Sequence, residues 1–392
     1  MPENQQDDSP AGVTRPMEEV RRYARRRYAL FLGHLVVGCL FIVALILGGS
    51  ELISGEALEI AGPRGYFTWV FFYFAGFSLA YLVVTLPLTF YREHVLERQF
   101  GLSTQTFGRW ARRRLKKWVL SFVVAAPLAL VIYATLRAWP ARWWLPAAAV
   151  WIFFAYVLAR FAPQILVPLF YKLRRVDNRR LESRLARLAE GAGLELEGAY
   201  RIDLSRETKK ANAAVVGMGS SRRVVLGDTL LSRFTEPEVA VVFAHELGHI
   251  VHDHLAKGFA VFSGLIVVSL YVGSLVLHWA SVELGIEPVG RSMNRVANPE
   301  TMPLLIAVLA GVQLLVLPFE KWYSRRRERQ SDAYALRATG DREAFLTAMK
   351  KLAALNLADV NPNKLAKIFL FSHPPILERI RFAKEFDAGT GE

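Results

Sequence analysis

Cysteine is almost absent from this 392-residue sequence, in which Cys39 lies alone inside an apolar segment. A framework of intramolecular disulfides is therefore excluded. Acidic residues are also few beside basic ones, 35 against 49, and the formal net charge is +14. No basic and aromatic recognition module accompanies this charge, so we expect no nucleic-acid partner. In a membrane protein such an excess gathers at the cytoplasmic surface, and anionic membrane lipids are its expected partners.

Long apolar segments are what the sequence does contain, since 53% of its residues are hydrophobic. A membrane-spanning helix needs roughly 20 predominantly apolar residues. Six stretches approach or exceed this length: 29–48, 67–90, 119–136, 144–170, 259–279 and 302–317. No small-residue cleavage site follows the first stretch before the chain turns acidic at Glu51, so we interpret that stretch as a retained span.

Basic residues alternate between the connecting segments as a six-span topology requires. They are dense before the first stretch, after the second and directly after the sixth, and sparse in the segments between. The positive-inside rule then places both termini and the region 171–256 in the cytoplasm. We expect a multi-pass protein of the cell inner (plasma) membrane.

The region 171–256 shows a mixed α and β pattern. An amphipathic helix is expected over 177–191, followed by strands near 200–204, 211–216 and 222–226. Thr235 and Glu238 then form a capping-box pattern that opens a helix, and Pro237 lies in its first turn. This helix contains the motif His-Glu-x-x-His.

The motif predicts a metal site, because His245 and His249 are four residues apart on one helical face. Glu246 follows the first histidine and is placed to take a proton from an attacking water. A zinc site needs a third ligand. Seven residues advance a helix axis by about 10 Å, which puts His252 too far from His245, and His254 lies on the wrong face and farther still. Neither fits one tetrahedral site.

The topology suggests another source for the third ligand. Glu328 follows the sixth stretch and His249 precedes the fifth, so a hairpin of these two spans would bring them together on one membrane face. Asp332 is one helical turn beyond Glu328, where it could accept a hydrogen bond from a ligating histidine. A solvated basic helix is the alternative interpretation of this segment.

Several segments, spread from about Tyr91 to Lys384, together resemble the type I CAAX prenyl proteases, integral-membrane zinc endopeptidases with bacterial relatives. The most specific segments are Ala-His-Glu-Leu-Gly-His at 244–249, Ser-Arg-Arg-Arg-Glu-Arg-Gln-Ser-Asp-Ala at 324–333 and Ser-His-Pro-Pro-Ile-Leu-Glu-Arg at 372–379. Supporting segments are 97–106, 168–172 and 223–231. Several matching blocks in one order are more specific than any single motif.

The resemblance implies one Zn²⁺ per chain, with Glu328 as its third ligand and Glu246 as the catalytic base. It also implies that His373 and Arg379 lie near the zinc. His373 is suited to donate to the oxyanion, and Arg379 to pair with Asp332. The alternative for both is a surface turn and a helix start.

The resemblance further implies that Asn212 and Ala213 lie on an edge strand that binds the substrate backbone, in a site open to the cytoplasm. The eukaryotic enzymes carry an additional N-terminal span without a counterpart here, and an aromatic residue where this chain has Ala214.

We therefore predict a mainly α, polytopic membrane helical protein of about six spans, with a small cytoplasmic α+β zinc metalloprotease domain. The predicted segments are a cytoplasmic N-terminal segment (1–28), four transmembrane helices with a basic cytoplasmic loop at 91–117 (29–170), the catalytic insert (171–256), helices five and six (257–320), and a C-terminal helical region with the third zinc ligand (321–392).

Peptides or proteins, including lipidated ones, are the expected substrates, and removal of the C-terminal tripeptide from prenylated proteins is the expected reaction. One alternative is a membrane-protein quality-control zinc protease that requires no prenyl group. A transporter or channel is an alternative from another class of protein, but it would leave the histidine and glutamate motifs unexplained. An inactive metal-binding scaffold is a further alternative, but it would give the base Glu246 no role.

Overall fold

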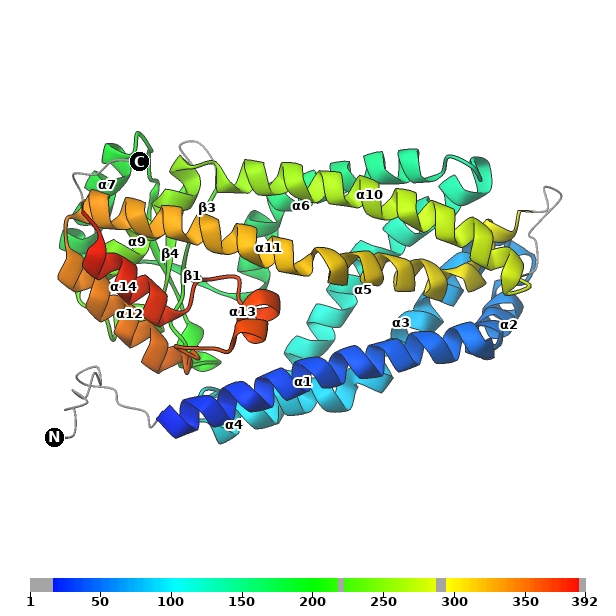
Figure 1. Ribbon diagram of the computed structural model, residues 1–392, viewed down its shortest axis with the longest axis horizontal. Helices are drawn as coiled ribbons and strands as arrows, with labels where there is room; N and C mark the ends of the chain where they lie inside the picture. Colours follow the sequence, from blue (N-terminus) through cyan, green and yellow to red (C-terminus); the bar gives the residue numbers. More distant parts are fainter. Residues whose placement is uncertain (1–16, 218–221, 287–293, 388–392) are drawn as a thin grey trace.

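The computed structural model describes residues 17–217, 222–286 and 294–387, and the side chains of 162–168 are not described. Long helices run along the longest axis of the molecule, and a smaller mixed α and β part lies at one end of them (Figure 1). The first turns of α1 and the last helix, α14, lie at this same end. Nearly all short elements belong to one end or the other.

Among the described residues, six helices are long and apolar enough to cross a membrane, as the sequence predicted. They are formed by α1 (Met17–Ala44), α3 (Tyr66–Phe90), α5 (Phe107–Ala138), α6 (Trp144–Phe170), α10 (His254–Glu283) and α11 (Met302–Thr339). The mainly helical, multi-pass fold with a small sheet is thereby confirmed. Helix α1 begins twelve residues before the expected span, and α11 continues unbroken through the boundary expected near residue 320.

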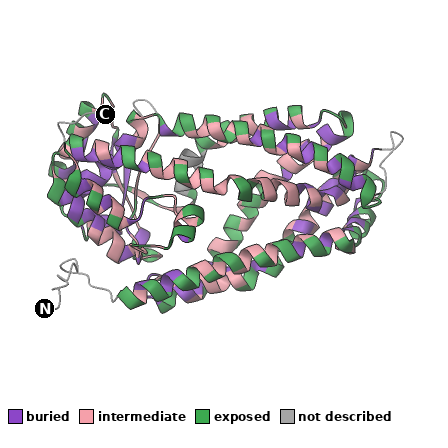
Figure 2. Cartoon of the chain, viewed as in Figure 1, coloured by how far each residue is buried: buried purple, intermediate pink, exposed green. Residues whose placement is uncertain are grey.

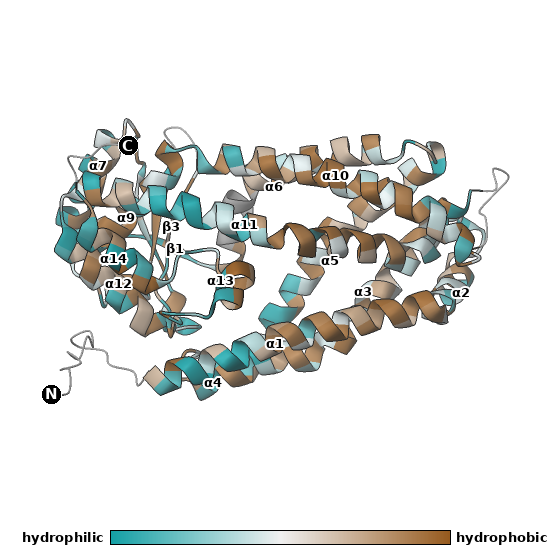
Figure 3. Cartoon of the chain, in the orientation of Figure 1, coloured by the Kyte–Doolittle hydropathy of each residue, from teal (hydrophilic) through white to brown (hydrophobic). Residues whose placement is uncertain are grey.

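Large apolar side chains are exposed along the middle of these helices (Figures 2 and 3). Leu40, Val123, Val268 and Leu315 are examples. A contiguous apolar surface of this extent is costly in water and favourable against lipid tails. The pattern indicates that the helix middles face a bilayer, while the hydrophilic end of the molecule lies outside it.

At the end of the spans farthest from the mixed α and β part, the chain changes direction after α1. Gly48 has a φ of 129°, which glycine adopts readily, and it lies in the π-helical turn η1 (Leu45–Gly49). Helix α2 (Ser50–Ala61) follows and packs on α3. Short 3₁₀ turns complete this end: η2 (Gly62–Arg64), η6 (Arg295–Ala297) and η7 (Pro299–Thr301).

A four-stranded sheet forms the centre of the smaller part, in the order β1-β2-β4-β3. Strands β2 and β4 are parallel, and both outer pairs are antiparallel. The strands are β1 (Leu173–Arg175), β2 (Gly198–Ile202), β3 (Ala213–Val216) and β4 (Arg223–Gly227). The three expected strands form with slightly shifted bounds, and β1 was missed. Residues 218–221, between β3 and β4, lie outside the described residues.

Helices surround this sheet and join it to the spans. They are η3 (Tyr91–Val95), α4 (Leu96–Gln99), α7 (Arg179–Gly191), η4 (Leu204–Arg206), α8 (Asp228–Leu231), α9 (Glu236–Val251), α12 (Arg342–Asn356), α13 (Lys364–Leu370) and α14 (Ile376–Glu385). Helix α9 is almost wholly buried between the sheet, α11 and α12. The centre of this part is therefore the helix that carries the His-Glu-x-x-His motif.

Candidate active site

Helix α9 begins at a capping box and ends two residues after the motif. The Glu238 carboxylate accepts the backbone N–H of Thr235 at 2.7 Å, and the predicted capping box is present. The helix ends at Val251, and Asp253 adopts a left-handed conformation with a φ of 52°. This sharp turn starts α10 at His254, so the two helices meet directly beside the motif.

Three side chains on α9 and α11 form a cluster that fits a metal ion. The Nε2 atoms of His245 and His249 are 3.3 Å apart. Glu328 Oε2 is 3.2 Å from His245 Nε2, and Glu328 Oε1 is 3.5 Å from His249 Nε2. Ligand atoms on a tetrahedral zinc ion are about 3.3 Å from one another, given metal–ligand distances near 2.0–2.1 Å. All three separations agree with that geometry.

The surroundings of the Glu328 carboxylate are also those of a metal ligand. It is buried, and its Oε2 atom has no hydrogen-bond partner among the described residues. A buried carboxylate oxygen without a partner is costly unless a cation satisfies it. The donor set of two imidazoles and one carboxylate, with space left for water or substrate, is that of catalytic zinc sites.

A buried ion pair holds the first histidine. His245 Nδ1 is 2.8 Å from Asp332 Oδ1, and Arg379 donates from Nε and Nη2 to the two oxygens of Asp332 at 2.8 and 2.5 Å. Burial alone would lower the pKa of His245, but its contacts with Asp332 and Glu328 raise this pKa to about 9. The surroundings thus favour a positive charge here, as a metal ion supplies.

Hydrogen bonds to His254, and from His254 to Gln330, hold the second histidine of the motif, His249. His249 Nδ1 is 2.9 Å from His254 Nδ1, and His254 Nε2 is 2.9 Å from Gln330 Oε1. The amide oxygen accepts, so His254 carries its proton on Nε2 and its Nδ1 is free to accept from His249. His249 Nε2 is then unprotonated and available to a metal. Burial and the nearby His245 lower the pKa of His249 to about 4, which favours this neutral form.

The expected base and oxyanion donor lie against the same cluster. Glu246 is half-buried, and burial raises the pKa of its carboxyl above the usual value. His373, in the loop before α14, has its Nε2 3.4 Å from Glu328 Oε1. Its side chain is 60% exposed, and Ser372 Oγ is 2.9 Å from its Nδ1. Ser372 therefore holds Nδ1 of the His373 ring, and Nε2 lies near the metal ligand Glu328.

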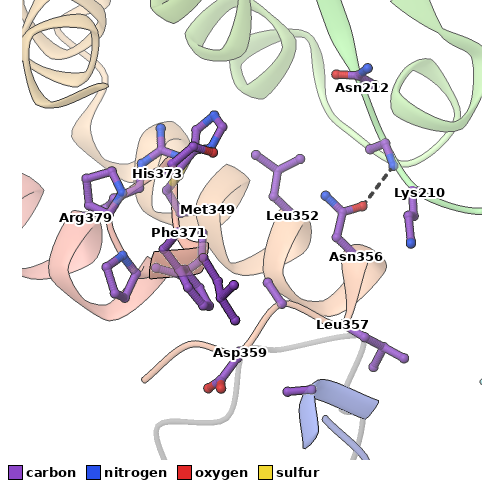
Figure 4. A pocket seen from close by; sticks show the side chains of 18 of the residues that line it. Lys210, Asn212, Met349, Leu352, Asn356, Leu357, Asp359, Phe371, His373 and Arg379 are labelled. Atoms are coloured by element: carbon purple, nitrogen blue, oxygen red, sulfur yellow. Dashed lines mark hydrogen bonds between the residues drawn. The ribbon is translucent and has the colours of Figure 1, made fainter. Parts of the chain in front are cut away.

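A cavity of about 680 Å³ opens onto these residues. Side chains from α1 and α11, including Phe31 and Leu317, line it together with His245 and Glu246. Figure 4 shows His373 and Arg379 on one side of this cavity and Lys210 and Asn212 on the other, with Asn356 accepting the backbone N–H of Ala211 at 3.2 Å. The cavity thus joins the metal-ligand cluster to side chains of two spans.

The structure places Asn212 and Ala213 at the start of β3, the edge strand of the sheet. Both line the cavity. Gly227 donates its N–H to the Asn212 carbonyl at 2.9 Å, so Asn212 faces β4. Because successive strand residues alternate, the N–H of Ala213 points away from β4, where Asn212 Oδ1 accepts it at 3.0 Å. This N–H lies on the open edge of the sheet.

Three parts of the site were missed from the sequence. The spacing argument against His254 assumed a continuous helix and was wrong about its distance, because the turn at Asp253 returns His254 to His249. Gln330 carried no signal, since its role depends on that turn. Gly248 lies inside the motif, but only the packing of α9 on α11 shows why glycine stands there.

Comparison with known proteins agrees with this geometry. Residues 175–387 match "Peptidase family M48", and residues 15–172 match "CAAX prenyl protease N-terminal, five membrane helices". The uncharacterized metalloprotease YhfN of Bacillus subtilis is 32% identical over 384 residues, covering 96% of this chain and 88% of that protein. CAAX prenyl protease 1 of Saccharomyces cerevisiae is 27% identical over 316 residues, covering 76% and 68%.

A solved structure shares the fold. The crystal structure of S. mikatae Ste24p superimposes with a TM-score of 0.80 at 21% identity, covering 95% of this chain and 91% of that one. Both the membrane helices and the smaller part therefore have counterparts in one known architecture.

Proposed function

The chain belongs to peptidase family M48 and is a multi-pass membrane metalloprotease, and from this premise we propose that it cuts peptides held at the membrane, with one Zn²⁺ on His245, His249 and Glu328. The observation that carries the proposal is the shared cavity. It is lined by the motif residues and by apolar side chains of two spans. A substrate anchored in the bilayer can thus reach the cluster without leaving the membrane surface.

Zinc at the three ligands would supply a Lewis acid that activates water and polarises the scissile carbonyl. Glu246 accepts the proton of the attacking water and returns it to the leaving amine. The raised pKa of its carboxyl suits both halves of this transfer. His373 donates from Nε2 to the oxygen that becomes negative in the transition state. Asp332, held by Arg379, keeps His245 in one orientation throughout.

The substrate backbone would bind along β3. An extended peptide can add to an open sheet edge through main-chain hydrogen bonds. Its carbonyl would accept the N–H of Ala213 in place of Asn212 Oδ1, which leads the peptide across the cavity towards Glu246. Ala214, small where the eukaryotic enzymes have an aromatic residue, leaves this edge less restricted.

The active site faces the cytoplasm in this proposal, and the chain lies in the cell inner (plasma) membrane. Support comes from the basic residues at the same end of the molecule as α9. Limited proteolysis of sealed, inside-out vesicles should cleave the region 171–256, and right-side-out vesicles should protect it. The reverse pattern would overturn the orientation.

Processing of prenylated CAAX proteins is the specificity that we propose, on the resemblance and the apolar lining of the cavity. Purified protein should cleave a farnesylated CAAX peptide, and a zinc chelator should abolish the cleavage. Glu246→Gln should lower turnover by roughly 10²–10⁴-fold while zinc stays bound. Glu385→Gln, an exposed carboxylate on α14, is the matched control and should keep full activity.

An unlipidated peptide of the same sequence separates two specificities. Cleavage at least tenfold slower than that of the farnesylated peptide supports CAAX processing. Equal rates would support a membrane-protein quality-control protease without a prenyl requirement. Unchanged activity in Glu246→Gln would overturn the mechanism for both.

A further inference from the structure

A second cavity, of about 370 Å³, lies between the ends of three spans and the catalytic part. We call it the basic pocket. It is lined by Arg27 of α1, by the segment from Arg92 to Gln105, by the first turns of α5, and by Tyr171 and Glu207. The hydrophilic first turns of α1 and α5 are visible in Figure 3. Neither the metal ligands nor Glu246 line this pocket.

The charges in the basic pocket do not cancel. Its basic side chains are Arg27, Arg92, Arg113, Arg114 and Lys117, and its carboxylates are Glu93, Glu97 and Glu207. Five positive charges thus face three negative ones, an excess of two. A local excess of positive charge attracts an anion.

The three carboxylates already have partners. Glu207 forms an ion pair with Arg113, and Glu97 with Lys210 at 2.8 Å. Glu93 lies 3.3 Å from Arg92 and 3.8 Å from Arg114.

Two cations remain without such a partner. Among the described residues, no carboxylate lies within ion-pair distance of Arg27 or Lys117. In addition, Arg114 Nε is buried and has no hydrogen-bond partner in the described part of the chain. A buried guanidinium N–H without an acceptor, beside two cations without a carboxylate partner, is suited to a phosphate oxygen.

The position of the basic pocket identifies the source of the phosphate. Arg27 directly precedes the apolar part of α1, Arg92 follows that of α3, and Lys117 precedes that of α5. Trp110 and Tyr171 also line the pocket, and such aromatic residues are typical of the headgroup layer. We propose that the basic pocket binds the phosphate headgroup of an anionic phospholipid.

Bound lipid would stabilise the contact between the spans and the mixed α and β part. Arg109 of α5 donates to the Arg206 carbonyl at 2.9 Å, and Arg113 reaches Glu207 of the same insert. A phosphate on Arg114 and Lys117 removes the repulsion among the cations at this contact. The full-length protein should therefore unfold at higher temperature with anionic than with zwitterionic lipid.

Helix α5 offers a matched test. Arg114→Gln with Lys117→Gln removes two charges that line the pocket, and Arg112→Gln with Lys116→Gln removes two exposed charges of the same helix that do not. Delipidated full-length protein is titrated with phosphatidylglycerol or phosphatidylcholine, and retained lipid is counted by native mass spectrometry. We expect the first pair to weaken phosphatidylglycerol binding by about 10–30-fold, at roughly a factor of five for each charge. The control pair should change it less than threefold.

Equal losses in both pairs would overturn the basic pocket in favour of diffuse surface attraction. A competition experiment with inorganic phosphate separates the two sources of phosphate. If millimolar inorganic phosphate displaces phosphatidylglycerol, the site is one for free phosphate and the lipid assignment fails. If the first pair does not fold in phosphatidylcholine, Lys117→Gln alone is compared with Lys116→Gln. Both are exposed lysines, so folding is preserved, and a loss of about fivefold is expected only for Lys117.

Discussion

Gly248 and Ser331 are in such close contact that the two helices carrying the metal ligands leave no room for a side chain between them. A Cβ atom added to Gly248 would lie 2.8 Å from Ser331 Cα and 3.2 Å from the Ser331 carbonyl oxygen. Ser331 is fully buried. Because the obstructing atoms belong to the backbone, no rotamer change can relieve the contact. This approach sets the distance between Glu328 on α11 and the histidines on α9.

Gly248→Ala should therefore separate the ligands. We expect α11 to move by several tenths of an ångström, zinc to bind at least tenfold more weakly, and peptide cleavage to fall by roughly 10²-fold. Zinc affinity is measured by competition with a fluorescent chelator. Gly264→Ala is the control, since no atom lies within 4 Å of its added Cβ. Equal affinities in both variants would contradict this account of the ligand spacing.

Much of the molecule followed from local signals in the sequence. The six spans are apolar for long enough to be identified from composition. Thr235 and Glu238 marked the start of α9, and the four-residue spacing of His245 and His249 fixed their common face. The order of the spans also placed Glu328 near the motif, because a hairpin of two long helices leaves little freedom at its ends.

Features that depend on one turn or on long-range packing were not accessible in this way. Asp253 adopts a positive φ without being glycine, so nothing in the sequence marked the turn that returns His254 to His249. Strand β1 has three residues and no alternation to detect. The cavity is assembled from α1, β3, α11 and the loop before α14, and its shape exists only once these segments have packed.

Removal of the metal should stop peptide cleavage and leave the fold intact. The histidines and Glu328 lie on helices that are packed against the sheet and α12, so the site is preformed. We expect a chelator to abolish activity, added Zn²⁺ to restore it, and circular dichroism to stay unchanged. Glu328→Gln removes the charge of one ligand and should bind zinc at least tenfold more weakly. Loss of helicity on chelation would contradict a preformed site.

His254 should determine how firmly His249 is held. Replacement by leucine removes the acceptor for His249 Nδ1 and frees the ring to adopt the other tautomer. We expect zinc affinity and activity each to fall by about 10–100-fold, as for other partners of metal-binding histidines. His254→Asn keeps an acceptor near the position of Nδ1 and should retain most of the affinity. If asparagine and leucine act alike, the effect is one of packing and the hydrogen bond has no role.

Glu238 should make stability depend on pH through the start of α9. Burial alone would raise the pKa of this carboxyl, but hydrogen bonds from Lys351 and from the Thr235 N–H hold it below its usual value. A carboxyl whose pKa is lower in the folded state stabilises that state fully above its unfolded pKa of about 4.5. This stabilisation is lost as the pH falls through the folded-state pKa.

Glu238→Gln keeps the shape of the side chain and removes the charge that Lys351 pairs with. At pH 7 the variant should be less stable by about 1–2 kcal/mol, a thermal midpoint roughly 2–8 °C lower. As the pH falls below 4.5 and through the lower folded-state pKa, the carboxylate takes up a proton, so the two midpoints should move closer together. Thermal unfolding in detergent at pH 7, 5, 4 and 3 measures this difference, and groups that titrate in both proteins cancel from it. Glu385→Gln, at an exposed site on the last helix, should match the wild type throughout. A difference that stays constant from pH 7 to pH 3 would show that packing, and not the charge of Glu238, anchors the helix of the metal-binding motif.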